Sequence, residues 1–291
     1  MRGARSSLGR GLVMNPSSFS ARDLGACHLV GACRFLPRPG APCPPGAAKR
    51  LSRRPMIRLL VLLAVWPTML MAGDDLTARF DVRFGPLRVA EIVIAATETG
   101  DAYAAAGRVT GAGLAGAFRD IHFDMAAEGR RDGPHLVPLT YREDVNTGRR
   151  ASRVALRYVD GLPIVVSALP VRAARDWDID PAEQPGTIDP MSALYRLARP
   201  RPLAELCNWS VAVFDGRRRS SLSLEVAEAD GESLLCEGRY ARIAGFPPEA
   251  MAERGVFPFT AEYRRGPDGD WRLTRVVAQT LYGRVRIIGR F

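Results

Sequence analysis

Period-two alternation of apolar and polar side chains is the feature that most constrains how this chain folds. It begins with Leu76, Phe80 and Phe84 on one face of an expected strand and Thr77 and Arg79 on the other. Because successive side chains of a β-strand point to opposite sides of its sheet, this pattern indicates a strand with one buried face. Similar runs continue to the end of the chain, separated by short Gly, Asp and Asn segments that are typical of hairpin turns.

The alternation predicts about a dozen strands joined mostly as hairpins. The expected strands cover residues 76–84, 89–97, 102–110, 118–129, 136–144, 152–159, 163–168, 207–214, 219–228, 233–243, 256–264, 271–281 and 284–291. Residues 170–190 are the longest irregular segment. Asp189 and Pro190 then indicate the start of one short helix over 191–198, because Asp is a favoured N-cap and Pro a favoured first helical residue. We therefore predict an all-β fold, an antiparallel meander curled into an open or closed barrel with one short helix.

One face of these strands is expected to mix core and cavity lining. The predicted members are Phe80, Val82, Phe84, Phe123, Val154, Leu156, Val211, Val213, Phe257, Phe259 and Val276.

The charge of the chain is divided near residue 72. The 291 residues hold 41 Lys and Arg against 31 Asp and Glu, a net charge of +10. Residues 1–72 contain 11 of the basic side chains and a single acid, Asp23, which leaves 30 basic and 30 acidic side chains in residues 73–291. The region with the strand pattern is neutral, so the sequence does not support a nucleic-acid partner.

Residues 56–72 have the pattern of a signal peptide. Arg58 precedes an apolar run over 59–71, and small residues follow at Ala72 and Gly73. The run is shorter than the roughly 20 apolar residues that span a bilayer, and no Cys follows it as a lipid attachment site. We expect cleavage after Ala72 and a mature periplasmic protein, residues 73–291, that forms a single β-rich domain and does not span the membrane.

Residues 1–55 form a leader without hydrophobic periodicity, which we interpret as disordered or as an over-long start assignment. Arg53 and Arg54 leave a twin-arginine export signal as an alternative. Cys27, Cys33 and Cys43 have spacings that match no common zinc site.

Two patterns with possible chemistry favour structural interpretations. The stretch 111–116 reads G-x-G-x-x-G, but an alternating strand pattern follows it where a dinucleotide site needs a helix. Asp176, Asp178 and Asp180 alternate, yet Pro181 stands where a calcium loop needs Gly, so we expect a solvated acidic loop. No metal or cofactor is expected.

The sequence contains no recognisable catalytic motif after residue 72. His122 and His135 are the only histidines there, and neither lies in a hydrolase or metal-ligand motif. A triad assembled from distant residues is left open, and we expect the protein not to be an enzyme.

Cys207 and Cys236 are predicted to form a disulfide, because they are the two cysteines of the exported region and thiols pair in an oxidising compartment. The simplest hairpin register opposes this pairing, since it places the two residues two strands apart, near 10 Å. The bond requires Cys207 to precede its strand or a bulge to shift the register.

Arg217, Arg218 and Arg219 follow the predicted Asp215-Gly216 turn. A solvated turn is the usual role of such a run. The alternative is contact with anionic lipid headgroups, because Arg binds phosphate through two parallel hydrogen bonds.

The chain resembles the exported bacterial family catalogued as domain of unknown function 3108. The similar segments are residues 84–85, 113–115, 189–195, 213–218, 236–238 and 280–283. The resemblance implies a β-rich envelope protein without an assigned reaction, and it supplies no catalytic residues.

Two hypotheses about function follow from these observations. In the first, the protein is a non-catalytic periplasmic barrel that binds a lipid or another apolar ligand, by analogy with other curled antiparallel sheets. In the second, it is a structural or assembly partner of an envelope complex, with a filled core.

Overall fold

The computed structural model describes residues 74–112 and 121–290. They form one sheet of 14 strands in the order β7-β6-β5-β4-β3-β2-β1-β14-β13-β12-β11-β10-β9-β8. The strands are β1 (Asp74–Phe84), β2 (Leu87–Thr99), β3 (Ala102–Gly111), β4 (His122–Asp132), β5 (His135–Asn146), β6 (Ala151–Val159), β7 (Leu162–Leu169), β8 (Thr187–Ile188), β9 (Trp209–Phe214), β10 (Arg219–Ala229), β11 (Ser233–Ala244), β12 (Val256–Arg265), β13 (Trp271–Thr280) and β14 (Gly283–Arg290).

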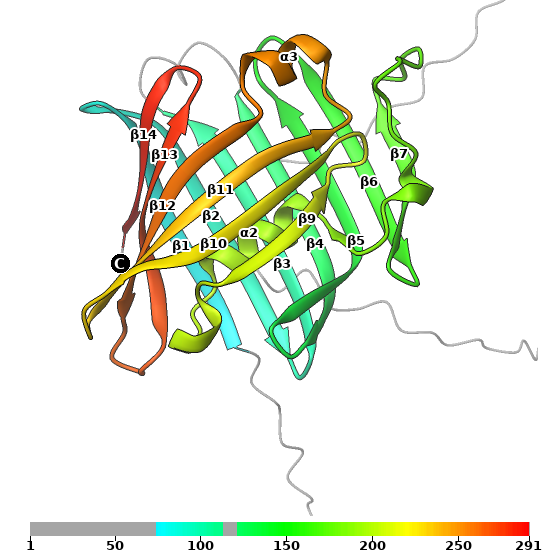
Figure 1. Ribbon diagram of the computed structural model, residues 1–291. Coiled ribbons are helices and arrows are strands. Elements are labelled where there is room, and N and C mark those ends of the chain that lie inside the picture. The colour runs from blue at the N-terminus through cyan, green and yellow to red at the C-terminus, as the bar shows by residue number, and fades with distance from the viewer. Residues whose placement is uncertain (1–73, 113–120, 291) are drawn as a thin grey trace, which may run out of the picture. The chain divides into compact units, whose positions relative to one another are not determined.

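This sheet confirms the predicted all-β fold, an antiparallel meander that curls into a nearly closed barrel (Figure 1). The first and last strands of the meander meet, because β1 pairs with β14 as well as with β2. Turn chemistry sets much of the register. Between β6 and β7, Asp160 and Gly161 have φ of 50° and 76°, the left-handed geometry that a two-residue hairpin needs.

The edges of the sheet are β7 and the two-residue strand β8. Strand β8 pairs with β9 in parallel, the single parallel pair among the described strands, and it was not predicted. The turn between β9 and β10 packs across the sheet onto β6. A Cβ on Gly216 would lie 2.6 Å from Val154 Cγ1, so only glycine allows this close approach. We call the region between β8–β9 and β5–β7 the seam.

The helix α2 (Pro190–Ala198) lies inside the curled sheet, where it contacts β3, β4, β5, β9 and β13. In Figure 1 it is visible between the front strands β9–β11 and the strands behind them. Its predicted start is confirmed: Asp189 is the N-cap, and its side chain accepts a hydrogen bond from Ser192 N. Met191 and Tyr195 are 0% and 1% exposed, which shows that the helix fills the interior.

The predicted inward face is mostly confirmed. Five of its members are buried: Phe80, Val154, Leu156, Val213 and Val276. Two more, Val211 and Phe259, are partly buried and pack against the core, while Val82, Phe123 and Phe257 are half-buried.

The prediction for Phe84 was wrong. This side chain is 42% exposed, because it stands at the last residue of β1 beside the turn that leads into β14.

Other differences concern boundaries and short elements. Strand β9 begins at Trp209 rather than at residue 207, and a second helix, α3 (Pro248–Glu253), lies between β11 and β12. Two 3-10 turns, η2 (Pro181–Glu183) and η3 (Leu203–Glu205), flank β8 and α2 along the chain.

The predicted leader 1–55 and signal peptide 56–72 lie outside the described residues. Within the described part, no helix is both long and apolar enough to cross a membrane.

Phe80 and Phe84 offer a matched test of the strand faces. Phe80→Ala should lower the free energy of unfolding by about 3–5 kcal/mol, because Phe80 is only 3% exposed and its removal leaves a cavity. Phe84→Ala removes an exposed ring and should cost less than about 1 kcal/mol. Denaturant unfolding of the two variants measures both values, and equal costs would show that the face assignment of β1 is wrong.

Candidate functional site at the seam of the barrel

A buried polar cluster holds the start of α2 inside the barrel. Asp189 is fully buried, and its carboxylate accepts hydrogen bonds from Ser192 N at 2.8 Å and from Ser192 Oγ at 2.6 Å. The Tyr103 hydroxyl, from β3, lies 2.7 Å from Ser192 Oγ and can donate to it. The Tyr103 ring also stacks on Tyr195, with ring centroids 5.3 Å apart. The N-cap therefore fixes the helix to β3 as well as starting it.

Burial changes the acid–base properties of this cluster. Loss of solvation raises the pKa of Asp189 from 3.8 to about 6, against the opposing effect of the hydrogen bonds from Ser192. Burial, and then the nearby Asp189 charge, raise the pKa of Tyr103, so its hydroxyl stays protonated and remains a donor.

A second polar group lies at the other end of α2. The Tyr195 hydroxyl donates to Glu98 at the end of β2. Glu98 also pairs with Arg131 Nε at 3.0 Å and lies 3.7 Å from Arg199 Nη1. Glu205 accepts from Arg199 Nη2 at 2.8 Å. These contacts neutralise part of the positive charge that gathers where the helix ends.

Three arginines at this end are buried, and they follow α2 or belong to its last turn: Arg196, Arg199 and Arg201. Cations suit the C-terminus of a helix, whose last carbonyls carry partial negative charge. Arg201 Nη1 donates to the carbonyl of Arg196. Burial lowers the pKa of Arg201 to about 10, which still leaves it charged at neutral pH.

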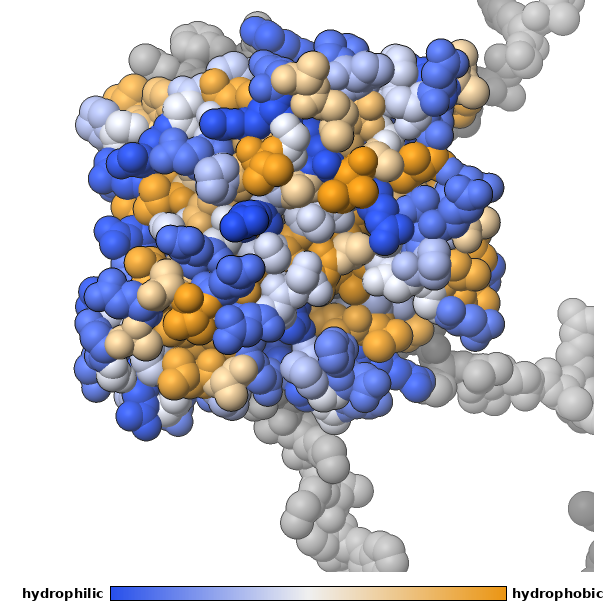
Figure 2. Space-filling model, in the orientation of Figure 1, coloured by the Kyte–Doolittle hydropathy of each residue, from blue (hydrophilic) through white to orange (hydrophobic). Residues whose placement is uncertain are grey.

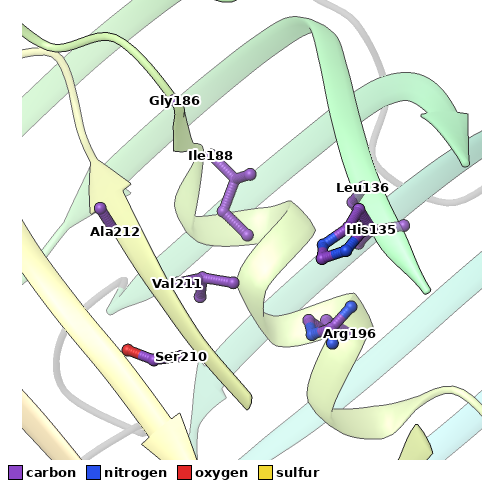
Figure 3. A pocket seen from close by; sticks show the side chains of 8 residues that line it. All are labelled: His135, Leu136, Gly186, Ile188, Arg196, Ser210, Val211 and Ala212. Atoms are coloured by element: carbon purple, nitrogen blue, oxygen red, sulfur yellow. The ribbon is translucent and has the colours of Figure 1, made fainter. Parts of the chain in front are cut away.

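A pocket of about 270 Å³ opens at the seam, between β5 on one side and β8–β9 on the other, with α2 as its floor (Figure 3). Its lining residues are His135, Leu136, Gly186, Ile188, Arg196, Ser210, Val211 and Ala212. In Figure 3 the Val211 side chain points toward α2, and His135 and Arg196 lie on the same side of the pocket. The pocket therefore combines an apolar wall with one cationic group.

Arg196 is only 5% exposed, although it lines this pocket. Its Nη1 donates to the Pro134 carbonyl, and its guanidinium lies 4.8 Å from the centroid of the Trp209 ring. Its Nε is buried and has no hydrogen-bond partner among the described residues. A buried donor without a partner is costly. Because the residue lines the pocket, the charge of its guanidinium favours an anionic group there, such as a carboxylate.

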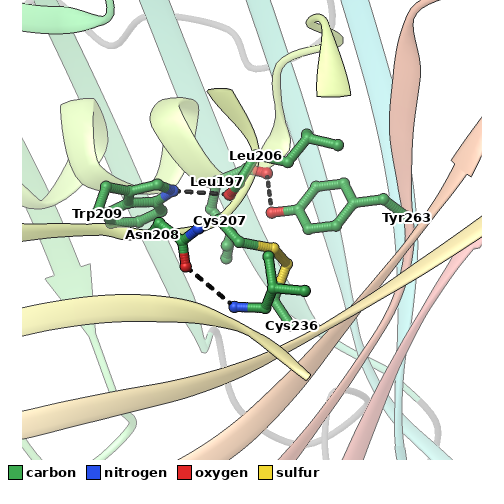
Figure 4. The surroundings of a disulfide bond; sticks show 8 residues. Leu197, Leu206, Cys207, Asn208, Trp209, Cys236 and Tyr263 are labelled. Atoms are coloured by element: carbon green, nitrogen blue, oxygen red, sulfur yellow. Dashed lines mark hydrogen bonds between the residues drawn. A yellow bond between two sulfur atoms is a disulfide. The ribbon is translucent and has the colours of Figure 1, made fainter. Parts of the chain in front are cut away.

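The two cysteines pair with each other, as the sequence predicts. Cys207 and Cys236 form a disulfide with their Cα atoms 6.1 Å apart (Figure 4). Both conditions that the sequence required are met. Cys207 precedes β9, with Asn208 at φ 61° reversing the chain, and the register of β10 and β11 shifts between Val226 and Glu228. Asn208 Oδ1 accepts from Val226 N at 3.2 Å, which holds the segment over β10.

The three consecutive arginines contact the protein rather than forming a purely solvated turn. Arg217 Nη2 donates to the Pro170 carbonyl at 3.0 Å, and Arg219 Nη1 donates to Gln184 Oε1 at 3.0 Å. The Arg218 guanidinium lies 5.4 Å from the Phe246 ring centroid. Each is half-buried, and their contact with anionic headgroups stays a prediction.

The acidic run is engaged locally. Asp178 pairs with Arg172 and accepts from Arg175 N, and Asp180 caps η2. Over residues 74–112 and 121–290, no three His, Cys, Asp or Glu side chains converge as metal ligands would.

The glycine run and the histidines occupy separate places. Gly111 ends β3 and His122 begins β4, while residues 113–120 lie outside the described part of the chain. His122 Nε2 lies 3.8 Å from Asp144 Oδ1 at the start of β4, whereas His135 of the seam pocket follows the turn at the other end of that strand.

The seam pocket was not predicted from the sequence. Its residues come from β5, β8, β9 and α2, which are distant along the chain, and nothing in the spacing of His135 and Arg196 indicates that they meet. The sequence places Arg196 in the last turn of the predicted helix, but it does not indicate that this side chain is buried.

Comparison with known proteins gives a family match and structural likenesses. The family described as "Protein of unknown function (DUF3108)" matches residues 79–238. No curated protein matches the sequence. Among solved structures, the chain is similar to a beta-barrel-like protein of Domain of Unknown Function DUF1849 from Brucella abortus, at 12% identity and a TM-score of 0.39, over 74% of this chain and 95% of that one.

Asp189 should make stability depend on pH. Its pKa is raised in the folded protein, so between about pH 4 and pH 6 the folded state holds a proton that the unfolded chain has released, and stability falls as the pH rises. The loss across this window should be about 3 kcal/mol. Asp189→Asn should remove it, whereas Asp180→Asn, at the exposed cap of η2, should keep the wild-type profile in denaturant unfolding at several pH values. Identical pH profiles for wild type and Asp189→Asn would contradict the prediction.

The disulfide should contribute measurable stability. It closes a loop with a sequence separation of 29 residues, for which chain entropy gives about 3–4 kcal/mol. The double variant Cys207→Ser/Cys236→Ser should lose that amount in denaturant unfolding, and a reductant should destabilise the wild type but not the variant. Alkylation of the denatured but unreduced protein checks the bond directly. Two modified thiols within residues 73–291 would show that the bond is absent.

Proposed function

Since the chain belongs to the family described as Protein of unknown function (DUF3108), whose name assigns no activity, we propose a function from the geometry of the seam. The protein is a non-catalytic, exported protein of the cell envelope that binds a small ligand with an anionic group and a short apolar part. The binding site is the pocket between β5 and β8–β9.

The single observation that carries this proposal is the buried Arg196 guanidinium on the pocket wall. Its positive charge attracts an anionic ligand, and a charge-assisted hydrogen bond in a partly dry site contributes about 1.5–3 kcal/mol. Leu136, Ile188 and Val211 supply the apolar wall beside it. A carboxylate or phosphate with a short alkyl group matches both features.

The size of the pocket restricts the ligand. Drug-sized ligands occupy pockets of about 300–1,000 Å³, and this pocket has about 270 Å³. The interior of the sheet holds α2, with Met191 and Tyr195 packed against the strands. A long acyl chain would have to displace that helix, so the proposal is for a small ligand at the seam instead of a lipid inside the barrel.

Export is supported by the disulfide, because such bonds persist mainly in oxidising compartments outside the cytoplasm. The apolar run before residue 72 supports the same location through its signal-peptide pattern.

A second candidate function is favoured by the filled interior. A barrel whose space is taken by its own helix can act through its outer surface as an assembly partner of an envelope complex. In this case the seam pocket is a packing irregularity and binds nothing.

Isothermal titration of the purified protein with hexanoate and with 1-hexanol distinguishes the two candidates. The seam proposal predicts saturable one-to-one binding of hexanoate and weaker binding of the uncharged alcohol. Arg196→Met should reduce hexanoate affinity at least tenfold, since it removes the charged donor but keeps an apolar stem. Arg142→Met, at an exposed position of β5 outside the pocket, is the control and should change the affinity less than twofold.

A second variant protects the test against a folding defect. Val211→Phe fills the pocket without changing its charge, so it should abolish binding of both compounds while the thermal melt stays cooperative. If neither hexanoate nor hexanol binds the wild type, the seam proposal fails and the assembly role is favoured.

A further inference from the structure

The connections at the two ends of the barrel differ in charge. Hairpin turns of a meander alternate between its ends, so five of the described connections lie together at one end: residues 100–101, 133–134, 160–161, 230–232 and 266–270. They contain no Lys or Arg. Their acids are Asp101, Asp160, Asp230, Glu232, Asp268 and Asp270. We call this the acidic end, and it is the lower end in Figure 1.

The described connections at the opposite end carry more arginines than acids, although Asp215, Glu249 and Glu253 lie on them. The segment between β5 and β6 contains Arg149 and Arg150, and the turn between β9 and β10 contains Arg217 and Arg218. Arg242 lies near the end of β11, and Arg254 follows α3. We call these six residues the basic rim, and α3 marks their end of the barrel in Figure 1.

Four members of the basic rim are linked by aromatic rings and backbone. The Arg218 and Arg242 guanidiniums each lie 5.4 Å from the Phe246 ring centroid. Arg242 and Arg254 lie 5.0 and 5.5 Å from the Phe257 ring centroid. Arg217 joins them through the chain, since Gly245 packs against its carbonyl. Cations alternate with rings along this line, so the side chains are held in place without acidic partners.

The arginines of the rim form no direct ion pairs among the described residues, although Asp215 and Glu143 interact electrostatically with Arg218. Within the described residues, no carboxylate oxygen lies within 4.0 Å of a guanidinium nitrogen of the six arginines. The nearby Asp215 carboxylate accepts hydrogen bonds from the backbone N–H groups of Arg217 and Arg218. Burial, and then repulsion from Arg172, lower the pKa of Arg217 against the attraction of Asp215.

Exposed apolar side chains stand at the same end, on the turns beside the rim. Tyr282 is 85% exposed and Leu281 38% exposed between β13 and β14. Leu87 is 65% exposed after the β1–β2 turn, and Phe84 lies 3.3 Å from the Cβ position of Gly283. Arg254 reaches this group, because its Nη1 donates to the Thr280 carbonyl at 3.0 Å. Elsewhere, Figure 2 shows hydrophobic and hydrophilic residues interspersed over one face of the barrel.

We propose that the end of the barrel bearing the basic rim docks on an anionic phospholipid surface. The arginines bind headgroup phosphates, and Tyr282, Leu281 and Leu87 enter the interface between headgroups and acyl chains. The acidic end is repelled by the same surface, so the protein is held upright with the rim against the lipid. This contact is separate from the seam pocket and does not depend on it.

Charge complementarity selects this occupant. The arginines are distributed along a rim on separate turns, which suits an extended array of phosphates more than one small anion. Each basic residue near an anionic membrane contributes about 1 kcal/mol, and interfacial tyrosine favours the headgroup region. A neutral chain therefore gains membrane affinity by separating its charges between its two ends.

Vesicle flotation tests the proposal with the purified protein. Vesicles of phosphatidylcholine alone should bind little protein. Vesicles with about one-third phosphatidylglycerol should bind it, and added salt should weaken this binding. Arg149→Gln/Arg150→Gln should lower the partition coefficient on anionic vesicles about 30-fold, the effect of two basic residues. Tyr282→Ser should lower it severalfold while keeping the salt dependence.

The matched control is Arg142→Gln/Arg157→Gln, which removes the same charge from exposed positions on the outer faces of β5 and β6. It should change the partition coefficient less than threefold. The turn at 149–150 is exposed, so its variant should keep the wild-type thermal melt. Absence of binding to anionic vesicles at low salt, equal binding to neutral vesicles, or an equal loss in the control would each overturn the proposal.

Discussion

The structure depends on filling the concave side of a curled sheet. Strands with one apolar face must bury that face, and a sheet of 14 strands encloses more space than its own side chains occupy. The short helix α2 occupies this space, with Met191 and Tyr195 fully enclosed. Asp189 anchors the helix, because its carboxylate caps the first turn and, through Ser192, reaches Tyr103 on β3.

Because α2 fills the interior, the candidate binding surfaces lie at the edges and ends of the barrel. Since α2 contacts both β9 and β5, Arg196 in its last turn lies at the seam, where the described strands are not closed by regular pairing. The seam pocket arises there from an incomplete closure, and Arg196 brings a charge into it. Packing of the helix and formation of the pocket therefore have the same physical origin.

The turns separate acidic from basic residues between the two ends of the barrel. A meander places alternate connections at opposite ends, so a bias of acids on one set of turns and arginines on the other gives the barrel two unlike ends. The neutral total of residues 73–291 conceals this separation. The disulfide has a related structural role, because Cys207 ties the segment after α2 to β11 and helps to keep the helix in the sheet.

The sequence by itself determined the strand periodicity, the hairpin turns and the capped helix after Asp189, because each depends on neighbouring residues. It also indicated the cysteine pair, through the expectation of export. It placed Phe84 inside, since alternation does not show where a strand leaves the core, and it gave no sign of β8. The tertiary structure decided that α2 lies within the barrel, that Arg196 meets the wall formed by β5 and β9, and that arginines from distant turns share one end. These features depend on the curl and stagger of the sheet, which bring together residues that no local pattern connects.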